Sequence, residues 1–316
     1  MDHTRLSILY VLLAGFFFSV TDISVKYFTL LMPLHEVVFF RSIIALIFTL
    51  SIILPFDGGW SSLRTRRPSL HILRGFCLVI ANLTFFSGLA VIPLAESTAI
   101  FFVAPLMITF MSAIFLLENV GYRRWLALFI GLIGVLLIIK PGTIKFEWMV
   151  FLPLAAALAY AVNNVLARKM GLSEKAITMA FYVHVTFILV SSSMGIAFGK
   201  GQFSGSENLA WEFIFRPWKI PDKEMIYIMF AAGFGSALGG YFISQAYRLS
   251  SASVVAPFEY CTLVLAVFWG FTLWGELPDS YAFFGIVLII SSGVFIAIRE
   301  IEKDRSSSIN KISAGR

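Results

Sequence analysis

Long apolar stretches separated by short polar or charged segments make up most of this chain. There are ten of them, each near 20 residues long, at residues 6–28, 34–54, 70–90, 94–117, 123–140, 148–168, 175–198, 224–246, 252–274 and 279–298. An α-helix rises about 1.5 Å per residue, so about 20 apolar residues cross the roughly 30 Å hydrocarbon core of a bilayer. The pattern therefore predicts an all-α integral membrane protein with ten transmembrane helices.

The second half of the pattern repeats the first. A shift of 142 residues aligns Phe18–Lys26 with Tyr160–Arg168, and a shift of 158 aligns Glu118 with Glu276. Each half, residues 1–146 and 147–300, contains five predicted helices, and an odd number makes the second half enter the membrane from the opposite side. The sequence thus predicts two inverted repeats, a common plan of secondary carriers that bind substrate near the bilayer midplane.

Two segments fall outside this repeat. The change of shift from 142 to 158 marks an insertion in the predicted external loop 199–223, which is rich in aromatic residues. Such a loop suits either a lid over the outer entrance or an anchor at the membrane interface. The Ser- and Lys-rich residues 301–316 predict a disordered cytoplasmic tail.

Composition and charge narrow the class of protein. With 59% hydrophobic and 13% charged residues, the chain has too little polar material to cover a soluble globule. Sixteen Lys and Arg residues lie on the side of the amino terminus and seven on the other, which predicts that both termini are cytoplasmic, in the inner membrane. This asymmetry accounts for the net charge of +6, so no nucleic-acid partner is expected. Cys77 and Cys261 predict neither a disulfide nor a metal site, and no cofactor is expected.

Several segments carry a family resemblance. They are TDISVKY, IPLAESTAIFFVAP, LLENVGYRRW, GLIGVLLIIKPG, APFEY and WGELPD. In this order the chain resembles the EamA-type carriers of the drug/metabolite transporter superfamily, in a branch similar to one with S-adenosylmethionine and riboflavin uptake carriers; other members move metabolites outward. The resemblance implies a central cavity surrounded by the first four helices of each half. The fold alone does not give the substrate.

Polar residues deep inside predicted helices are the candidates for a substrate cavity. An acid near the centre of a membrane helix costs about 2.5–3.5 kcal/mol on insertion scales, so Glu259 is predicted to face a cavity and bind a substrate cation or a proton, or else to fix helix packing. Arg41 is its natural counter-charge, or that of Glu36 or an anionic substrate. His184 suits a proton relay or a neutral hydrogen-bonded role, and Asn82 suits substrate contact or helix association.

Two further groups complete the predicted site. Aromatic residues expected to stack against a planar substrate are Tyr260, Tyr182, Tyr241, Phe86 and Phe101. Residues expected to form gates or helix ends are Asp22, Lys26, Asn164, Arg168, Glu96, Glu118 and Glu276.

The sequence predicts a secondary transporter of a small organic metabolite, S-adenosylmethionine-, riboflavin- or amino-acid-like, working by alternating access, and not an enzyme. No Gly-Lys-Ser/Thr phosphate loop supports an ATP-driven pump. The alternatives are a polytopic membrane enzyme, which the scattered histidines disfavour, and a membrane assembly partner, which needs no deeply placed charges. Export rather than import, proton coupling, and a monomeric or homodimeric state are left open.

Overall fold

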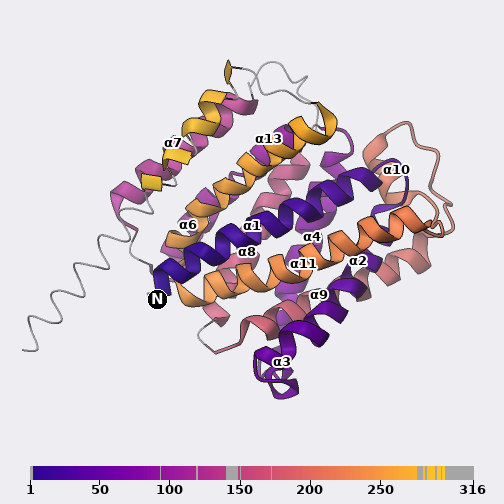
Figure 1. The fold of residues 1–316 in the computed structure, drawn as a ribbon, viewed down its shortest axis with the longest axis horizontal. Helices are drawn as coiled ribbons and strands as arrows, with labels where there is room; N and C mark the ends of the chain where they lie inside the picture. Colours follow the sequence, from indigo (N-terminus) through magenta and orange to yellow (C-terminus); the bar gives the residue numbers. More distant parts are fainter. Residues whose placement is uncertain are drawn as a thin grey trace, which may run out of the picture.

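The structure is a computed structural model, which describes residues 3–92, 94–118, 120–139, 149, 151–171, 173–275, 280–281, 283–288, 290–292 and 294–295. Within these residues all regular secondary structure is helical (Figure 1). Glu276 and residues 301–316, predicted to form a helix end and a tail, lie outside the described residues.

The elements in chain order are α1 (His3–Phe28), α2 (Leu34–Phe48), the π-helix η1 (Thr49–Ile53), α3 (Leu54–Phe56), the 3-10 helix η2 (Trp60–Leu63), α4 (Pro68–Leu89), α5 (Leu94–Phe101), α6 (Ala104–Phe115), α7 (Tyr122–Ile139), α8 (Phe151–Met170), α9 (Ala176–Phe198), α10 (Leu209–Phe215), α11 (Lys223–Leu249), α12 (Ala252–Val255), the 3-10 helix η4 (Ala256–Tyr260) and α13 (Cys261–Trp274). Seven described segments are long and apolar enough to cross a membrane, with α2, η1 and α3 forming one and η4 and α13 another.

Two predicted spans are interrupted. The stretch 94–117 forms two helices, because α5 ends at Phe101 and α6 begins at Ala104. Pro105, in the first turn of α6, has no amide hydrogen to donate to the Phe101 carbonyl, so a continuous α-helix cannot pass this point. The stretch 252–274 narrows into η4 beside Pro257. The last predicted span, 279–298, is only partly described, and some of its residues are helical.

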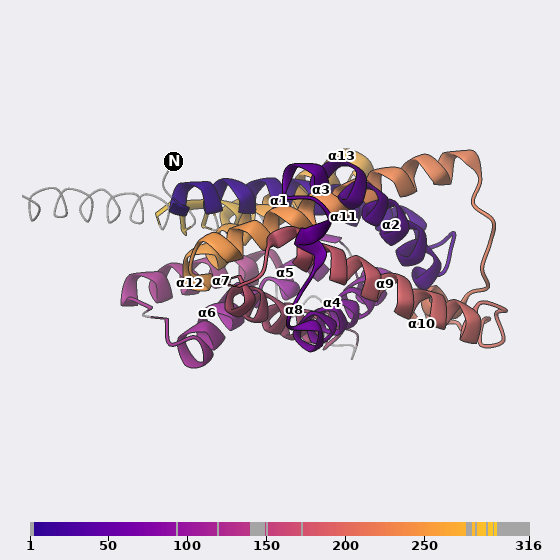
Figure 2. The same ribbon diagram turned by 90° about the horizontal axis from the view of Figure 1, so that it is seen from below.

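Helices from the two halves of the chain pack against one another. α1 lies along α11, α2 packs against α9 and α11, and α4 packs against α8 and α9. Figures 1 and 2 both show α1 and α11 side by side, while α7 lies at the edge of the bundle in Figure 1. The centre of the molecule is therefore an interface between the halves.

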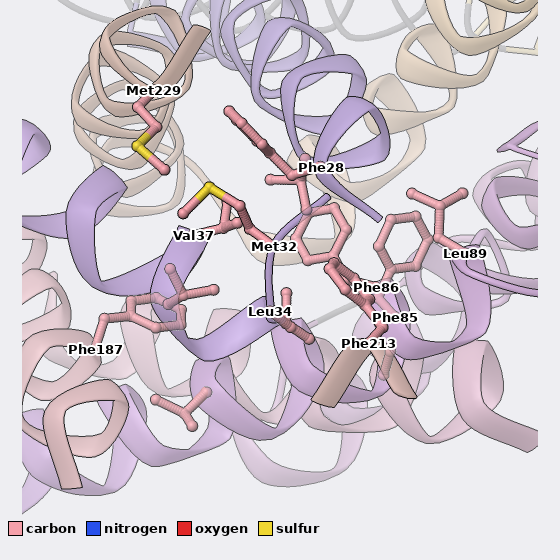
Figure 3. Close-up of a cluster of buried hydrophobic side chains, with 14 of the residues drawn as sticks. Phe28, Met32, Leu34, Val37, Phe85, Phe86, Leu89, Phe187, Phe213 and Met229 are labelled. Carbon is pink, nitrogen blue, oxygen red and sulfur yellow. The ribbon is translucent and has the colours of Figure 1, made fainter. Parts of the chain in front are cut away.

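The 199–223 segment packs onto the molecule. Phe213 of α10 is fully buried in an apolar cluster with Phe28, Met32 and Leu34, which come from the end of α1 and the start of α2 (Figure 3). The ring centroid of Trp218 lies 5.5 Å from that of Phe39 and 5.8 Å from that of His35. The insertion thus covers the ends of α1 and α2 that lie away from the amino terminus.

Candidate functional site

A cavity lies between the two halves of the chain. Its interior offers about 170 Å³ to the centre of a water-sized sphere. Its wall comes from α1, α2, α4, α5, α8, α9, α11, η4 and α13. Aromatic residues of the wall are Phe18, Phe85, Phe86, Phe101, Phe102, Tyr160 and Phe187, and the charged ones are Asp22, Arg41, Arg74 and Glu259. Such a mostly apolar hollow with a few polar groups is typical of a small-molecule site.

Arg41 reaches the cavity from the inward face of α2. It shares this face with the buried Leu34, Val37, Val38 and Ala45. Its Nη2 donates a hydrogen bond to Asn82 Oδ1 at 2.8 Å. Its Cζ lies 5.7 Å from the ring centroid of Phe86 and 5.5 Å from that of Phe187, which suits cation–π attraction.

The predicted acidic partners of Arg41 lie elsewhere. Glu259 is hydrogen-bonded to tyrosines, and Glu36 Oε2 accepts a hydrogen bond from the Lys219 amide at 3.0 Å. The acid whose charge acts on Arg41 is Asp22, although the two form no close ion pair. The Arg41 Nε has no hydrogen-bond partner. One corner of the cavity therefore contains a buried guanidinium with an unused donor.

His184 lies beside Arg41 on α9. It is 4% exposed, and neither ring nitrogen has a hydrogen-bond partner. Its Nε2 faces the backbone of Gly240, 3.9 Å from the point where a Cβ would stand. The absence of a side chain at Gly240 keeps this part of the cavity open.

Glu259 lies in η4, where the helix is interrupted. Its carboxylate accepts hydrogen bonds from the Tyr247 hydroxyl and the Tyr160 hydroxyl. It is 7% exposed, and no described cation forms an ion pair with it. Two hydroxyl donors thus hold a buried carboxylate at the cavity wall.

Arg74 of α4 is a cavity residue that the sequence did not single out. It is 2% exposed, its Nη2 donates to Ser244 Oγ at 3.3 Å, and its Nε and Nη1 have no partner. Its place seven residues after Arg67 groups it with the basic flank of the helix. The helical spacing that puts Arg74, Leu78 and Asn82 on one face is the signal that could have identified it.

The predicted aromatic residues divide into two groups. Phe86 and Phe101 line the cavity, whereas Tyr260, Tyr182 and Tyr241 do not. Tyr260 packs on Phe102 with ring centroids 5.5 Å apart, and Tyr182 stacks on His71 at 4.6 Å. The Tyr241 hydroxyl accepts a hydrogen bond from Gln245 Nε2 at 2.8 Å. These three tyrosines pack between helices.

Among the predicted gate residues, Asp22 lines the cavity beside Arg41. Lys26 lies over the Trp274 ring, 4.2 Å from its centroid. Asn164 Oδ1 accepts a hydrogen bond from Asn163 Nδ2 at 3.1 Å.

Arg168 and Glu118 form a link between helix ends. Arg168 Nε lies 3.2 Å from Glu118 Oε1, and Arg168 Nη1 donates to the Arg248 carbonyl at 3.3 Å. Glu118 Oε1 also accepts the Ala252 amide at 3.2 Å, so it caps the start of α12. Glu96 belongs to α5, and its side chain lies outside the described part.

Comparison with known proteins identifies the family. The model of the EamA-like transporter family matches residues 5–140 and again residues 147–298. The chain belongs to the EamA-like transporter family. The sequence-based resemblance is thereby confirmed, and this EamA-like transporter is a multi-pass membrane protein.

Relatives of this EamA-like transporter have different names. It is 28% identical over 284 residues to an S-adenosylmethionine uptake transporter of Rickettsia felis, covering 89% of each chain. It is 27% identical to a riboflavin transporter of Vibrio cholerae, covering 96% of each, and 28% identical to a pseudopaline exporter of Pseudomonas aeruginosa, covering 92% of this chain and 95% of the exporter. A crystal structure with a TM-score of 0.73 and 17% identity, covering 92% of this chain and 96% of that one, shares the fold.

Proposed function

We propose that this EamA-like transporter is a secondary carrier that moves a small organic metabolite by alternating access through the cavity lined by Glu259. The observation that carries the proposal is the cavity itself, because it lies between the halves and contains four buried charged side chains: Asp22, Arg41, Arg74 and Glu259. Ionisable groups inside a membrane bundle are typical of substrate or ion pathways. The relatives' names make S-adenosylmethionine-, riboflavin- and amino-acid-like solutes the first candidates, in either direction of transport.

The proposed architecture is ten helices in two inverted halves, with both termini in the cytoplasm of a cell bounded by this inner membrane. The cavity wall supports it, because the shifts of 142 and 158 residues found in the sequence pair wall residues with wall residues. These pairs are Phe18 with Tyr160, Thr21 with Asn163, Arg41 with Val183, Ser42 with His184, Leu78 with Ser236, Asn82 with Gly240, Phe85 with Ile243, Phe86 with Ser244 and Phe101 with Glu259. A two-fold axis through the cavity explains this pairing.

Alternating access requires closure on each side of the cavity. On the proposed outer side, the cluster around Phe28, Met32 and Phe213 joins the 199–223 segment to α1 and α2 (Figure 3). On the proposed inner side, Arg168 bonds to Glu118, and Glu174 Oε2 lies 3.4 Å from His71 Nε2. We assign the apolar cluster to the outer gate and these polar links to the inner gate.

The test is transport in proteoliposomes made with purified protein. Uptake and release of S-adenosylmethionine, riboflavin and amino acids are measured with and without a proton gradient. The variant Glu259→Gln keeps the size of the side chain but removes the charge, so we expect loss of transport with normal membrane insertion. Glu224→Gln, at the exposed start of α11, is the matched control and should transport normally.

Two results would oppose the proposal. Full activity of Glu259→Gln would remove the central role of this residue. Failure of wild-type protein to move any solute in the panel, with intact folding, would favour a membrane enzyme or an assembly partner instead.

A further inference from the structure

Two of the four cavity charges have no opposite charge to balance them. Asp22 acts on Arg41, but Arg74 has no acidic neighbour and Glu259 has no basic neighbour among the described residues. A buried charge is costly unless a partner or hydrogen bonds compensate it. Arg74 and Glu259 therefore present two unbalanced charges of opposite sign to the same cavity.

Arg74 has the donors to bind an anion. Only Nη2 is used within the described structure, by Ser244, and both Nε and Nη1 are buried without a partner. Nε and one terminal nitrogen of a guanidinium form a fork that matches the two oxygens of a carboxylate. The free edge of Arg74 is suited to a planar carboxylate.

Glu259 is suited to a cation on the same substrate. The hydroxyls of Tyr247 and Tyr160 hold its carboxylate in place at the wall. Tyr160 also lies within electrostatic range of Arg74 and lines the cavity itself. Because Tyr160 stands between the two charges, Arg74 and Glu259 are neighbours in one part of the cavity without forming an ion pair.

We propose that this part of the cavity binds the zwitterionic head of an α-amino acid or of a compound that carries such a head, with the carboxylate on Arg74 and the ammonium on Glu259. The inference rests on the proposed carrier function and specifies its substrate class. An α-amino acid has its two charges on substituents of one carbon, which fits two opposite charges separated by a single tyrosine. The rest of the substrate then lies among Phe85, Phe86 and Phe101.

The test is binding to purified full-length protein in detergent, measured by calorimetry. The probes are the proteinogenic L-amino acids. Each amino acid that binds is compared with the matching amine, which lacks the carboxylate, and with the matching deaminated acid; for phenylalanine these are phenethylamine and hydrocinnamate. We expect at least one amino acid to bind and each matched compound to bind about 10- to 100-fold more weakly, the range expected for losing a charged hydrogen bond.

Variants test the two residues separately. Arg74→Gln should weaken binding of the amino acid about 10- to 100-fold but leave binding of the matching amine unchanged, and Arg74→Lys should retain part of the affinity. The control is Arg66→Gln, an exposed arginine in the loop before α4, which should bind like wild type. Because the matched compounds are also tested on wild-type protein, the inference is tested even if Arg74→Gln fails to fold.

The inference is overturned if no amino acid binds, or if an amine or deaminated acid binds as tightly as its parent. Transport separates this failure from that of the carrier function. A solute that lacks an amino-acid head but crosses proteoliposome membranes would sink the inference and preserve the carrier. Amino acids that bind and are never transported would preserve the inference and sink the carrier.

Discussion

Replacing Gly235 with alanine is the sharpest test of how the two halves meet. Gly235 lies on the face of α11 that packs along α1. A methyl group at this position would stand 2.6 Å from the Phe17 carbonyl oxygen and 2.7 Å from Thr21 Oγ1. Because real Cβ atoms do not come within 3.0 Å of such atoms, and because the first contact is backbone, α11 must move away by about 0.4 Å.

That movement has a calculable effect on stability. Overpacking a close contact costs about 1–3 kcal/mol. The displacement also strains the hydrogen bond from Thr21 Oγ1 to the Ala232 carbonyl, 3.2 Å long, which joins the same two helices. Alanine is favoured over glycine within a helix by about 1 kcal/mol, so the clash is best measured against a second glycine-to-alanine change that shares this gain.

Gly240 provides that control on the same helix. A methyl group there meets only His184 Nε2, at 3.9 Å, which is an ordinary contact. At roughly 2–4 °C per kcal/mol for a chain of this size, Gly235→Ala should melt roughly 2–10 °C below Gly240→Ala in detergent. Melting is compared at one heating rate, because unfolding of such proteins is usually irreversible.

Equal melting temperatures for Gly235→Ala and Gly240→Ala would refute this reasoning. They would mean that α1 and α11 do not approach as closely as the structure has them, and that the small residues of α11 mark a flexing point instead of a contact. Transport by Gly235→Ala then becomes informative, because wild-type rates would exclude rocking at this segment.

Two further predictions concern the ends of the cavity. Trp218→Ala removes the ring that packs on Gly195, His35 and Phe39, so proteinase added to the side of the 199–223 segment should cleave it faster; unchanged cleavage would show that Phe213 alone holds the segment. Glu174→Ala removes the acceptor of the Thr65 hydroxyl, 2.9 Å away, and the partner of His71. Its melting temperature in detergent should therefore fall by the equivalent of about 1–3 kcal/mol, against no change for Glu224→Ala.

Helix positions were largely predictable because they depend on apolar length, a property that the chain displays in every span. The predicted 148–168 corresponds to α8 at Phe151–Met170, and 175–198 to α9 at Ala176–Phe198. The interruption between α5 and α6 was not predicted, because apolar residues continue through it and only Pro105 marks it. Hydropathy measures whether a segment prefers lipid, and it does not detect one missing backbone donor.

The partners of the site residues were less predictable than the residues themselves. Glu259, Arg41, His184 and Asn82 line the cavity, and the energetic cost of a buried polar group is what identified them. That cost does not say which neighbour satisfies the group. Asn82 and two tyrosines satisfy Arg41 and Glu259, because helix packing brings these neutral groups closer than the opposite charges.

The charges break the symmetry that the wall of the cavity follows. Each charged position has an uncharged mate under the sequence shifts: Asp22 with Asn164, Arg41 with Val183, Arg74 with Ala232 and Glu259 with Phe101. Comparing the halves of the chain therefore reveals the frame and cannot reveal the charges. In the proposed mechanism, a repeated frame lets the two halves exchange conformations, while the unrepeated charges let one substrate bind in one orientation. Arg74 illustrates the difference, because only its place on the helix face with Asn82, and no internal similarity, assigns it to the cavity.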